Sequence, residues 1–251
     1  MQTARSPYPV QRQPDEAGDS KESRARQYIN FSYYKLDPAW RRLPKEQRDK
    51  GITEWLSVYH AFRDRLLIYP YTLFGIRADA DFMLWRISYR LEDFVEMATA
   101  LARTGLGGYL SPTYSYLSMT KRSMYVDKHV HEGQEGDRLT IHVSDAKYLV
   151  VYPFEKTREW YLLTSHTRQG MMNEHIEIGH KYPTVKLNTT YSFGLDDQEF
   201  VVAFETDHLE DFLDLVQELR GTEGSRYTKR DTPIFTAIAG EIEAVLESLG
   251  G

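Results

Sequence analysis

The chain has 251 residues, a formal net charge of −6 and no cysteine. The lack of cysteine excludes disulfides, thiolate nucleophiles and cysteine-ligated metal centres, and it fits a cytoplasmic protein. The negative charge argues against a nucleic-acid partner, which requires a basic surface, and no apolar run approaches the roughly 18 residues of a membrane span.

The first 25 residues differ in composition from the rest of the chain. They are rich in Pro, Gln, Ser and charged residues, and they contain no apolar run of the kind found in secretory signals. This composition predicts a disordered tail over residues 1–25.

Residues 26–121 predict a first unit that mixes strands and helices. Trp55, Leu56, Tyr59 and Phe62 recur at helical spacing, and apolar or alternating runs mark the strands. The expected elements are a strand at 27–36, one long helix within 37–65, strands at 66–76 and 80–88, a helix at 91–104 and a strand at 112–121. Their order is β-α-β-β-α-β.

A polar connecting loop is expected at 122–146, and the same order of elements then restarts in a second unit at 147–251. The expected elements are a strand at 147–154, a helix at about 164–181, strands at 184–193 and 198–206, a helix at 208–221, a strand at 232–238 and a terminal helix from about residue 241. Pro153 is expected to end the first of these strands, because proline cannot continue a central ladder. Lys156 and Trp160 would then lie on a loop.

The two units also match in sequence at a constant offset of 118 residues. Leu91-Glu92-Asp93-Phe94 corresponds to Leu209-Glu210-Asp211-Phe212 without a gap. Further matches are Phe82 with Phe200, Leu101 with Leu219, Thr104 with Thr222 and Tyr109 with Tyr227. The repeat predicts an α+β fold of two ferredoxin-like units, which would stack their sheets or close them into one dimeric α+β barrel.

His175 lies on the apolar face of the helix expected at 164–181. Met171, Met172, Ile178 and Tyr182 share that face with it, at helical spacing. Two interpretations fit an inward imidazole: a core histidine bonded to a backbone carbonyl, or a metal ligand, in particular the axial ligand of a haem. A zinc site is disfavoured because no second histidine faces the same way at ligand spacing.

Tyr152, Lys156 and Trp160 follow one another at the end of the strand that precedes this helix. Taken singly, each is typical of a structural role: a strand aromatic, a solvated lysine and a hydrophobic anchor. Together with His175 they place a phenol, an ammonium and an indole near one imidazole. That combination favours a binding site for an anionic, aromatic cofactor.

Several stretches of the second half resemble the chlorite dismutase family of haem proteins, and within it the coproheme decarboxylases. They are YPFEKTREWYLL, MMNEHIEIGHKYP, SFGLDDQEFVVAFE, LRGTEGSRY and TPIFT. The resemblance covers most of residues 108–240. It implies a pair of ferredoxin-like units that form an α+β barrel, a ring-shaped homopentamer, and a haem in the C-terminal unit.

The resemblance also implies roles for individual residues. His175 matches the proximal iron ligand, and Tyr152 matches the tyrosine that forms the reactive radical. Lys156 matches a pocket lysine that assists proton movement at the reacting propionate, and Trp160 matches the motif tryptophan beside the haem. The expected propionate contacts are Arg138, Ser225 and Tyr116.

Two departures from the family pattern concern the opposite face of the cofactor. Chlorite dismutases carry a distal arginine after a Val-Lys pair, whereas here Leu187 and Asn188 follow that pair. Leu187 or Asn188 would therefore face the iron, and the arginine expected for chlorite chemistry is missing. His129, in a His-Val sequence typical of one group of decarboxylases, is the expected distal base, with His131 as the alternative.

The resemblance implies oxidative decarboxylation of iron coproporphyrin III (coproheme) to haem b, with hydrogen peroxide as oxidant. The expected partners are coproheme, peroxide, further copies of the chain and, transiently, a coproporphyrin ferrochelatase. The alternatives are chlorite dismutation and a haem-binding or haem-sensing protein without catalysis.

Overall fold

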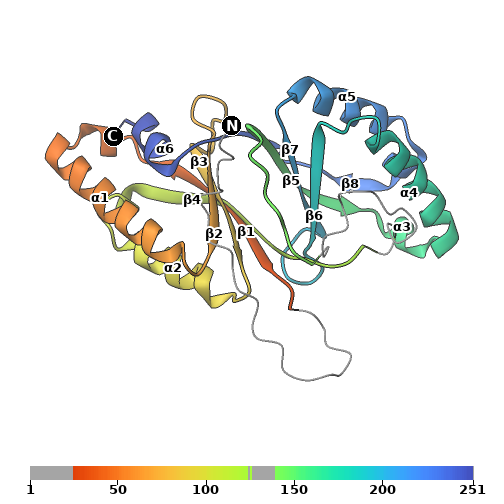
Figure 1. The fold of residues 1–251 in the computed structure, drawn as a ribbon, viewed down its shortest axis with the longest axis horizontal. Coiled ribbons are helices and arrows are strands. Elements are labelled where there is room, and N and C mark those ends of the chain that lie inside the picture. Colours follow the sequence, from red (N-terminus) through yellow and green to blue (C-terminus); the bar gives the residue numbers. More distant parts are fainter. Residues whose placement is uncertain (1–24, 124, 126–138, 251) are drawn as a thin grey trace, which may run out of the picture. The chain divides into compact units, whose positions relative to one another are not determined.

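The computed structural model describes residues 25–123, 125 and 139–250 (Figure 1). These residues divide into two compact units, one containing the chain up to Ser115 together with Gly240 onwards, the other Tyr116–Ala239. The division differs from the expected boundaries, because the terminal helix α6 (Ile242–Ser248) belongs to the first unit. There α6 buries three apolar side chains, and its Glu243 bonds to His60 of α1 at 3.0 Å.

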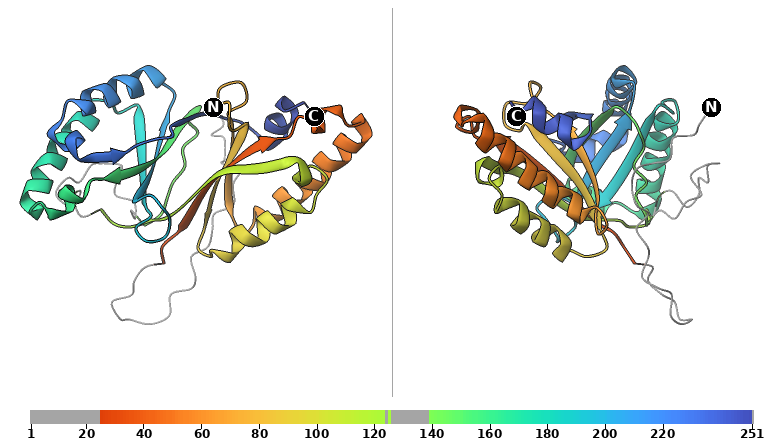
Figure 2. Two further views of the ribbon diagram at one scale, coloured as in Figure 1. Left: turned by 180° about the vertical axis from the view of Figure 1, so that it is seen from behind. Right: turned by 60° about the vertical axis from the view of Figure 1, so that its left-hand side comes forward.

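The first unit is a four-stranded sheet with helices. Its elements are β1 (Tyr28–Leu36), α1 (Lys45–Phe62), β2 (Leu67–Thr72), β3 (Phe82–Ser88), α2 (Glu92–Ala102), the start of β4 (Leu110–Met119), and α6. β3 lies between β1 and β2, and α1 lies beside α2 (Figures 1 and 2).

The long helix predicted within 37–65 is present as α1 and occupies only part of that range. A short 3-10 turn (Trp40–Arg42) precedes α1, which begins at Lys45. Leu43, directly before Pro44, is extended with a ψ of 151°, because a residue that precedes proline is disfavoured in the helical region.

The second unit repeats this arrangement. Its elements are β5 (Tyr148–Lys156), α3 (Arg158–Leu162), α4 (Ser165–Gly179), β6 (Val185–Tyr191), β7 (Phe200–Thr206), α5 (Leu209–Arg220), β8 (Thr228–Arg230) and β9 (Phe235–Ala239). β7 lies between β5 and β6, and the other edge of β5 pairs first with β9 and then with β8. α4 lies beside α5 (Figure 2).

Three expectations for this unit were wrong. Pro153 does not end the strand, since β5 continues to Lys156. On one edge of β5, pairing with β9 stops at Val151 and pairing with β8 starts at Glu155. Pro153 lies in the gap between them, so its missing N–H costs no hydrogen bond to a neighbouring strand. Trp160 is not on a loop but in the short helix α3, and the strand β8 was not expected.

The internal repeat is visible in the structure. β3 and β7 have the same bounds at the offset of 118 residues, and so do the starts of β2 and β6. The hydroxyl of Thr104 donates to the Leu101 carbonyl at 2.7 Å, and that of Thr222 donates to the Leu219 carbonyl at 2.8 Å. The prediction of an α+β fold with two ferredoxin-like units is confirmed.

The two units differ in how their cores are filled. α1 buries Gly51, Trp55 and Tyr59, whereas α4, its counterpart in the repeat, buries no residue. The largest fully buried side chains of the described residues follow the same division, since all but Phe235 belong to the first unit. The layer between helix and sheet therefore holds fully buried aromatic rings in the first unit, whereas in the second unit no side chain of α4 is fully buried. No helix among the described residues is long and apolar enough to cross a membrane.

Candidate functional site

The floor of the candidate site is one face of the sheet formed by β5, β7 and β6. Residues directly opposite in antiparallel strands share a face, so Tyr152 lies on the same face as Val202 and Thr189. Phe204 lies two residues after Val202 on the same face, opposite Leu187 of β6. The rings of Tyr152 and Phe204 stack, with their centroids 5.8 Å apart.

This register decides which of Leu187 and Asn188 on β6 lies on the same face as Tyr152, which the sequence left open. Leu187 shares the face of Tyr152, whereas Asn188 lies on the other face, where its amide donates to buried Glu205 at 2.7 Å. Leu187 is 45% exposed although it lies in a sheet, and Thr189 on the same face is exposed too.

α4 covers this face of the sheet and carries His175. Ile178, near the end of α4, packs against the buried cluster that contains Val202 and Phe204, and His175 lies three residues earlier on the same side of the helix. Burial of the half-buried imidazole, and then the charge of Lys156, lower the pKa of His175 to about 4. The imidazole is therefore neutral at neutral pH, which is the form that ligates a metal.

Lys156 is the last residue of β5, and its ammonium points to the same region. Its Nζ donates to the carbonyl of Gly224 at 2.8 Å and lies 4.7 Å from the centroid of the Trp160 ring. Burial lowers the pKa of Lys156 to about 8, and the charge of Glu199 opposes that shift. This lysine is therefore not the solvated side chain of the simpler interpretation.

Trp160 forms a buried aromatic wall beside Lys156. It is 3% exposed, and its ring lies 5.6 Å from that of Tyr227 and 6.4 Å from that of Tyr125. Trp160 therefore also serves as the hydrophobic anchor of α3, and the structural and functional interpretations of this residue are compatible.

Ser225 lies in a 3-10 turn (Glu223–Tyr227) that approaches α4. A Cβ on the neighbouring Gly224 would lie 3.9 Å from Cβ of Met171, one turn before His175. The hydroxyl of Ser225 donates within its own turn, to the carbonyls of Arg220 and Thr222. It is near the other residues, but it must rotate before it can donate to a carboxylate.

Tyr116 lies elsewhere. Its ring packs against Phe235 of β9, and Phe235 is opposite Val151 of β5. Val151 and Tyr152 point to opposite faces of the strand, so the structure does not bring Tyr116 together with Tyr152. The other predicted residues, His129, His131 and Arg138, lie outside the described residues.

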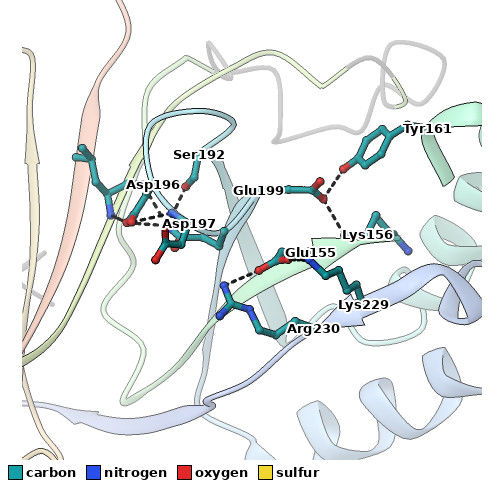
Figure 3. Close-up of polar contacts among 11 residues, drawn as sticks. Glu155, Lys156, Tyr161, Ser192, Asp196, Asp197, Glu199, Lys229 and Arg230 are labelled. Atoms are coloured by element: carbon teal, nitrogen blue, oxygen red, sulfur yellow. Dashed lines mark hydrogen bonds and ion pairs between the residues drawn. The ribbon is translucent and has the colours of Figure 1, made fainter. Parts of the chain in front are cut away.

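Sequence reasoning missed two charged groups. The carboxylate of Glu199 contacts both β5 and α3 (Figure 3), and Arg220 forms an ion pair with Asp231. Burial raises the pKa of the Tyr152 phenol, the charge of Asp231 raises it further and that of Arg220 lowers it. Glu199 and Arg220 lie within the stretches that carried the resemblance, but only the three-dimensional contacts reveal what they touch.

These groups fit a large planar ligand that carries a metal and carboxylates. The side chain of Leu187, exposed on the face of the sheet that carries Tyr152, offers apolar contact area. A neutral imidazole suits a metal such as iron, and the Lys156 ammonium is a partner for a carboxylate.

Comparisons with known proteins agree on one family. A family model described as chlorite dismutase matches residues 48–239. A coproheme decarboxylase from Mycolicibacterium smegmatis is 31% identical over 206 residues, which cover 82% of this chain and 81% of that protein.

Solved structures of related proteins are similar over most of their length. A chlorite dismutase from Candidatus Nitrospira defluvii in complex with imidazole has a TM-score of 0.81 and 27% identity, covering 90% of this chain and 95% of the other. A haem-binding protein from Thermus thermophilus has a TM-score of 0.78 and 25% identity, with the same coverage.

Proposed function

The chain belongs to the chlorite dismutase family, and from this premise we propose that it converts coproheme to haem b by peroxide-dependent oxidative decarboxylation. Each of two propionates loses carbon dioxide, one proton and two electrons and becomes a vinyl group. One hydrogen peroxide takes up two electrons and two protons per decarboxylation and yields two waters. The iron porphyrin, when bound, supplies both the reacting propionates and the redox chemistry.

The observation that carries the proposal is the position of His175 on the side of α4 that faces the sheet surface of Tyr152, on a helix in which no side chain is fully buried. His175 is the proposed iron ligand, because its imidazole is neutral and its helix has no buried residue. The family membership and the 31% identity to a coproheme decarboxylase support the same substrate.

Tyr152 is the proposed catalytic residue. Its buried phenol keeps its proton over the whole physiological pH range, because burial raises its pKa. One-electron oxidation with loss of that proton gives a phenoxyl radical, which takes a hydrogen atom from the propionate side chain and becomes phenol again. Release of carbon dioxide and a second electron then leaves the vinyl group. Holding the radical beside one C–H bond is catalysis by proximity.

Lys156 is proposed to hold the reacting carboxylate, and Trp160 to keep the ammonium in place. Ser225 and Arg138 remain proposed contacts to the other propionates, and His129 the proposed distal base. The homopentamer, the contact with a ferrochelatase and the cytoplasmic location also remain predictions.

Chlorite dismutation is the second candidate, because several of the similar solved structures are chlorite dismutases. Against it stands the apolar side chain of Leu187, on the face where an arginine would be needed to act on an anionic oxidant. A haem-binding protein without turnover is the third candidate. Oxygen release on addition of chlorite would favour the second, and spectral binding without conversion would favour the third.

The decisive experiment is a coproheme titration followed by addition of peroxide and mass spectrometry of the porphyrin. We expect a Soret shift on binding and the loss of two carbon dioxide molecules with peroxide. Tyr152→Phe should bind coproheme but form no haem b. The matched control is Tyr148→Phe. Tyr148 lies on the same face of β5, four residues before Tyr152, so this variant also loses one phenol hydroxyl from that face. Normal conversion by Tyr152→Phe would contradict the mechanism, and no Soret shift in the unaltered protein would contradict the function.

A further inference from the structure

One carboxylate oxygen joins the end of β5 to the helix α3. Oε2 of Glu199 accepts a hydrogen bond from the backbone N–H of Lys156 at 2.8 Å and another from the hydroxyl of Tyr161 at 2.5 Å (Figure 3). Burial and the bond to Glu199 raise the pKa of Tyr161, so this hydroxyl stays a donor. Glu199 itself lies directly before β7.

These two bonds fix the segment that carries the ammonium and the indole of the candidate site. The segment is residues 156–161. One bond holds its first residue, Lys156, and the other holds its last, Tyr161, which directly follows Trp160. In addition, the N–H of Thr157 donates to the carbonyl of Tyr227 at 2.8 Å. The spacing between the Lys156 ammonium and the Trp160 ring therefore depends on Glu199.

Glu199 also supplies a negative charge toward Lys156. Burial disfavours the ammonium, and Glu199 is the group that favours it. Other titratable groups also lie in this region. The charge of Lys156 lowers the pKa of His175 on α4, and this imidazole is neutral above about pH 4. Tyr161 is a neutral phenol. Glu155, on the preceding position of β5, is paired with Lys229 and Arg230.

The internal repeat allows the bonds of Glu199 to be compared with those of its counterpart in the first unit. Asp81 is the counterpart of Glu199, and its Oδ2 accepts from the N–H of Leu36, the last residue of β1, at 2.8 Å. A carboxylate that closes the end of the first strand is thus common to both units. Only in the second unit does the same oxygen also hold an aromatic hydroxyl, and only there is the strand's last residue a site lysine.

We propose that Glu199 is a positioning residue for the reaction: its carboxylate holds the backbone of Lys156 and the helix α3 in the geometry that receives the substrate carboxylate. The negative charge of Glu199 in addition favours the ammonium form of Lys156. This inference rests on the proposed function. Glu199 acts through Lys156 and Tyr161 and need not touch the porphyrin itself.

The test uses Glu199→Gln, which keeps an acceptor for both bonds but removes the charge, and Glu199→Ala, which removes both. Asp81→Asn is the matched control in the first unit. Amide hydrogen exchange of residues 154–161, measured on porphyrin-free protein by mass spectrometry, reports positioning without requiring activity. The kcat and KM for coproheme, measured across pH, report the effect of the charge.

In Glu199→Ala we expect exchange of this segment to rise and kcat to fall by about tenfold or more, the factor that one charge-assisted hydrogen bond represents. In Glu199→Gln we expect unchanged exchange, and a kcat that falls at pH 8 and recovers toward pH 6.5, where Lys156 is protonated without help. Asp81→Asn keeps an acceptor for the Leu36 N–H, so it should leave both the exchange of residues 154–161 and kcat unchanged.

Unchanged exchange in Glu199→Ala would overturn the positioning role, and a Glu199→Gln profile identical to that of the unaltered protein would overturn the charge role. If the unaltered protein forms no haem b while exchange responds as expected, the proposed function fails and the structural part of this inference stands.

Discussion

The ammonium nitrogen of Lys156 lies 4.7 Å from the centroid of the Trp160 ring while it donates to the carbonyl of Gly224 at 2.8 Å. A cation over an indole face is attracted by the ring quadrupole, and the attraction reaches about 2 kcal/mol when the pair is desolvated. The ring and the carbonyl thus compensate part of the solvation that the ammonium loses, and they leave Nζ with one further donor for a ligand.

Trp160→Ala should lower the free energy of unfolding by about 3–5 kcal/mol, because the buried ring anchors α3. Trp160→Phe, which keeps a ring beside Lys156, is the control and should lose far less. Urea denaturation followed by circular dichroism measures both. A Trp160→Ala variant as stable as the unaltered protein would show that the ring is not part of the core.

The stability of the porphyrin-free protein should depend on pH through Lys156. Its folded-state pKa of about 8 is below the ordinary 10.5, so between these values the unfolded state binds a proton that the folded state does not. The free energy of unfolding that Lys156 contributes is therefore largest above pH 10.5 and decreases as pH falls toward 8. Below pH 8 it no longer changes with pH.

Lys156→Met removes this titration. The difference in unfolding free energy between the unaltered protein and Lys156→Met should therefore rise from pH 8 to 10.5, as urea denaturation at stepped pH can measure. A flat difference would mean that the ammonium is as well solvated in the folded protein as in the unfolded chain.

His175→Ala should weaken coproheme binding by more than the roughly 10–100-fold that loss of an outer-shell partner costs, because it removes the proposed iron ligand itself. His166→Ala, on the exposed side of the same helix, should bind normally. An absorbance titration measures both. With the pKa of His175 at about 4, binding should persist down to about pH 4 and weaken below it, as protons compete for the imidazole.

α4 should exchange its backbone amides faster than α1 in the porphyrin-free protein, because α1 buries Trp55 and Tyr59 whereas α4 buries nothing. Coproheme should slow exchange in α4 and leave α1 unchanged. Hydrogen exchange read by mass spectrometry compares the two helices within one sample, so α1 is an internal control. Equal protection of both helices without ligand would contradict the expectation that a helix with no fully buried side chain opens more readily.

The sequence predicted most of the fold because its signals are local or repeated. Helical spacing located α4 and put His175 on its inner side, and apolar patterns located β6, β7 and α5. The offset of 118 residues then showed that the two units repeat one another. The error at Pro153 has a non-local cause: whether a proline disrupts β5 depends on where β8 and β9 pair with it, about 80 residues later in the chain.

The candidate site was predictable only in part, for a similar reason. Tyr152, Lys156, Trp160 and His175 follow one another closely in the chain, and the structure places them around one face. Tyr116 was expected there too, but strand alternation carries its partner Phe235 to the opposite face. Which side of a sheet a residue occupies is fixed by a register that the sequence alone did not supply.

The uneven filling of the two units has a consequence for the lifetime of the protein in a cell. A ligand that binds only the folded state adds RT ln(1 + [L]/Kd) to its stability, about 2.7 kcal/mol at a hundredfold excess over Kd. Here that gain falls on the unit whose helix α4 has no fully buried side chain. If the proposed function holds, copies that meet no porphyrin would open first at α4 and be degraded by proteases, and the abundance of the protein would follow the supply of the proposed substrate without any dedicated regulator.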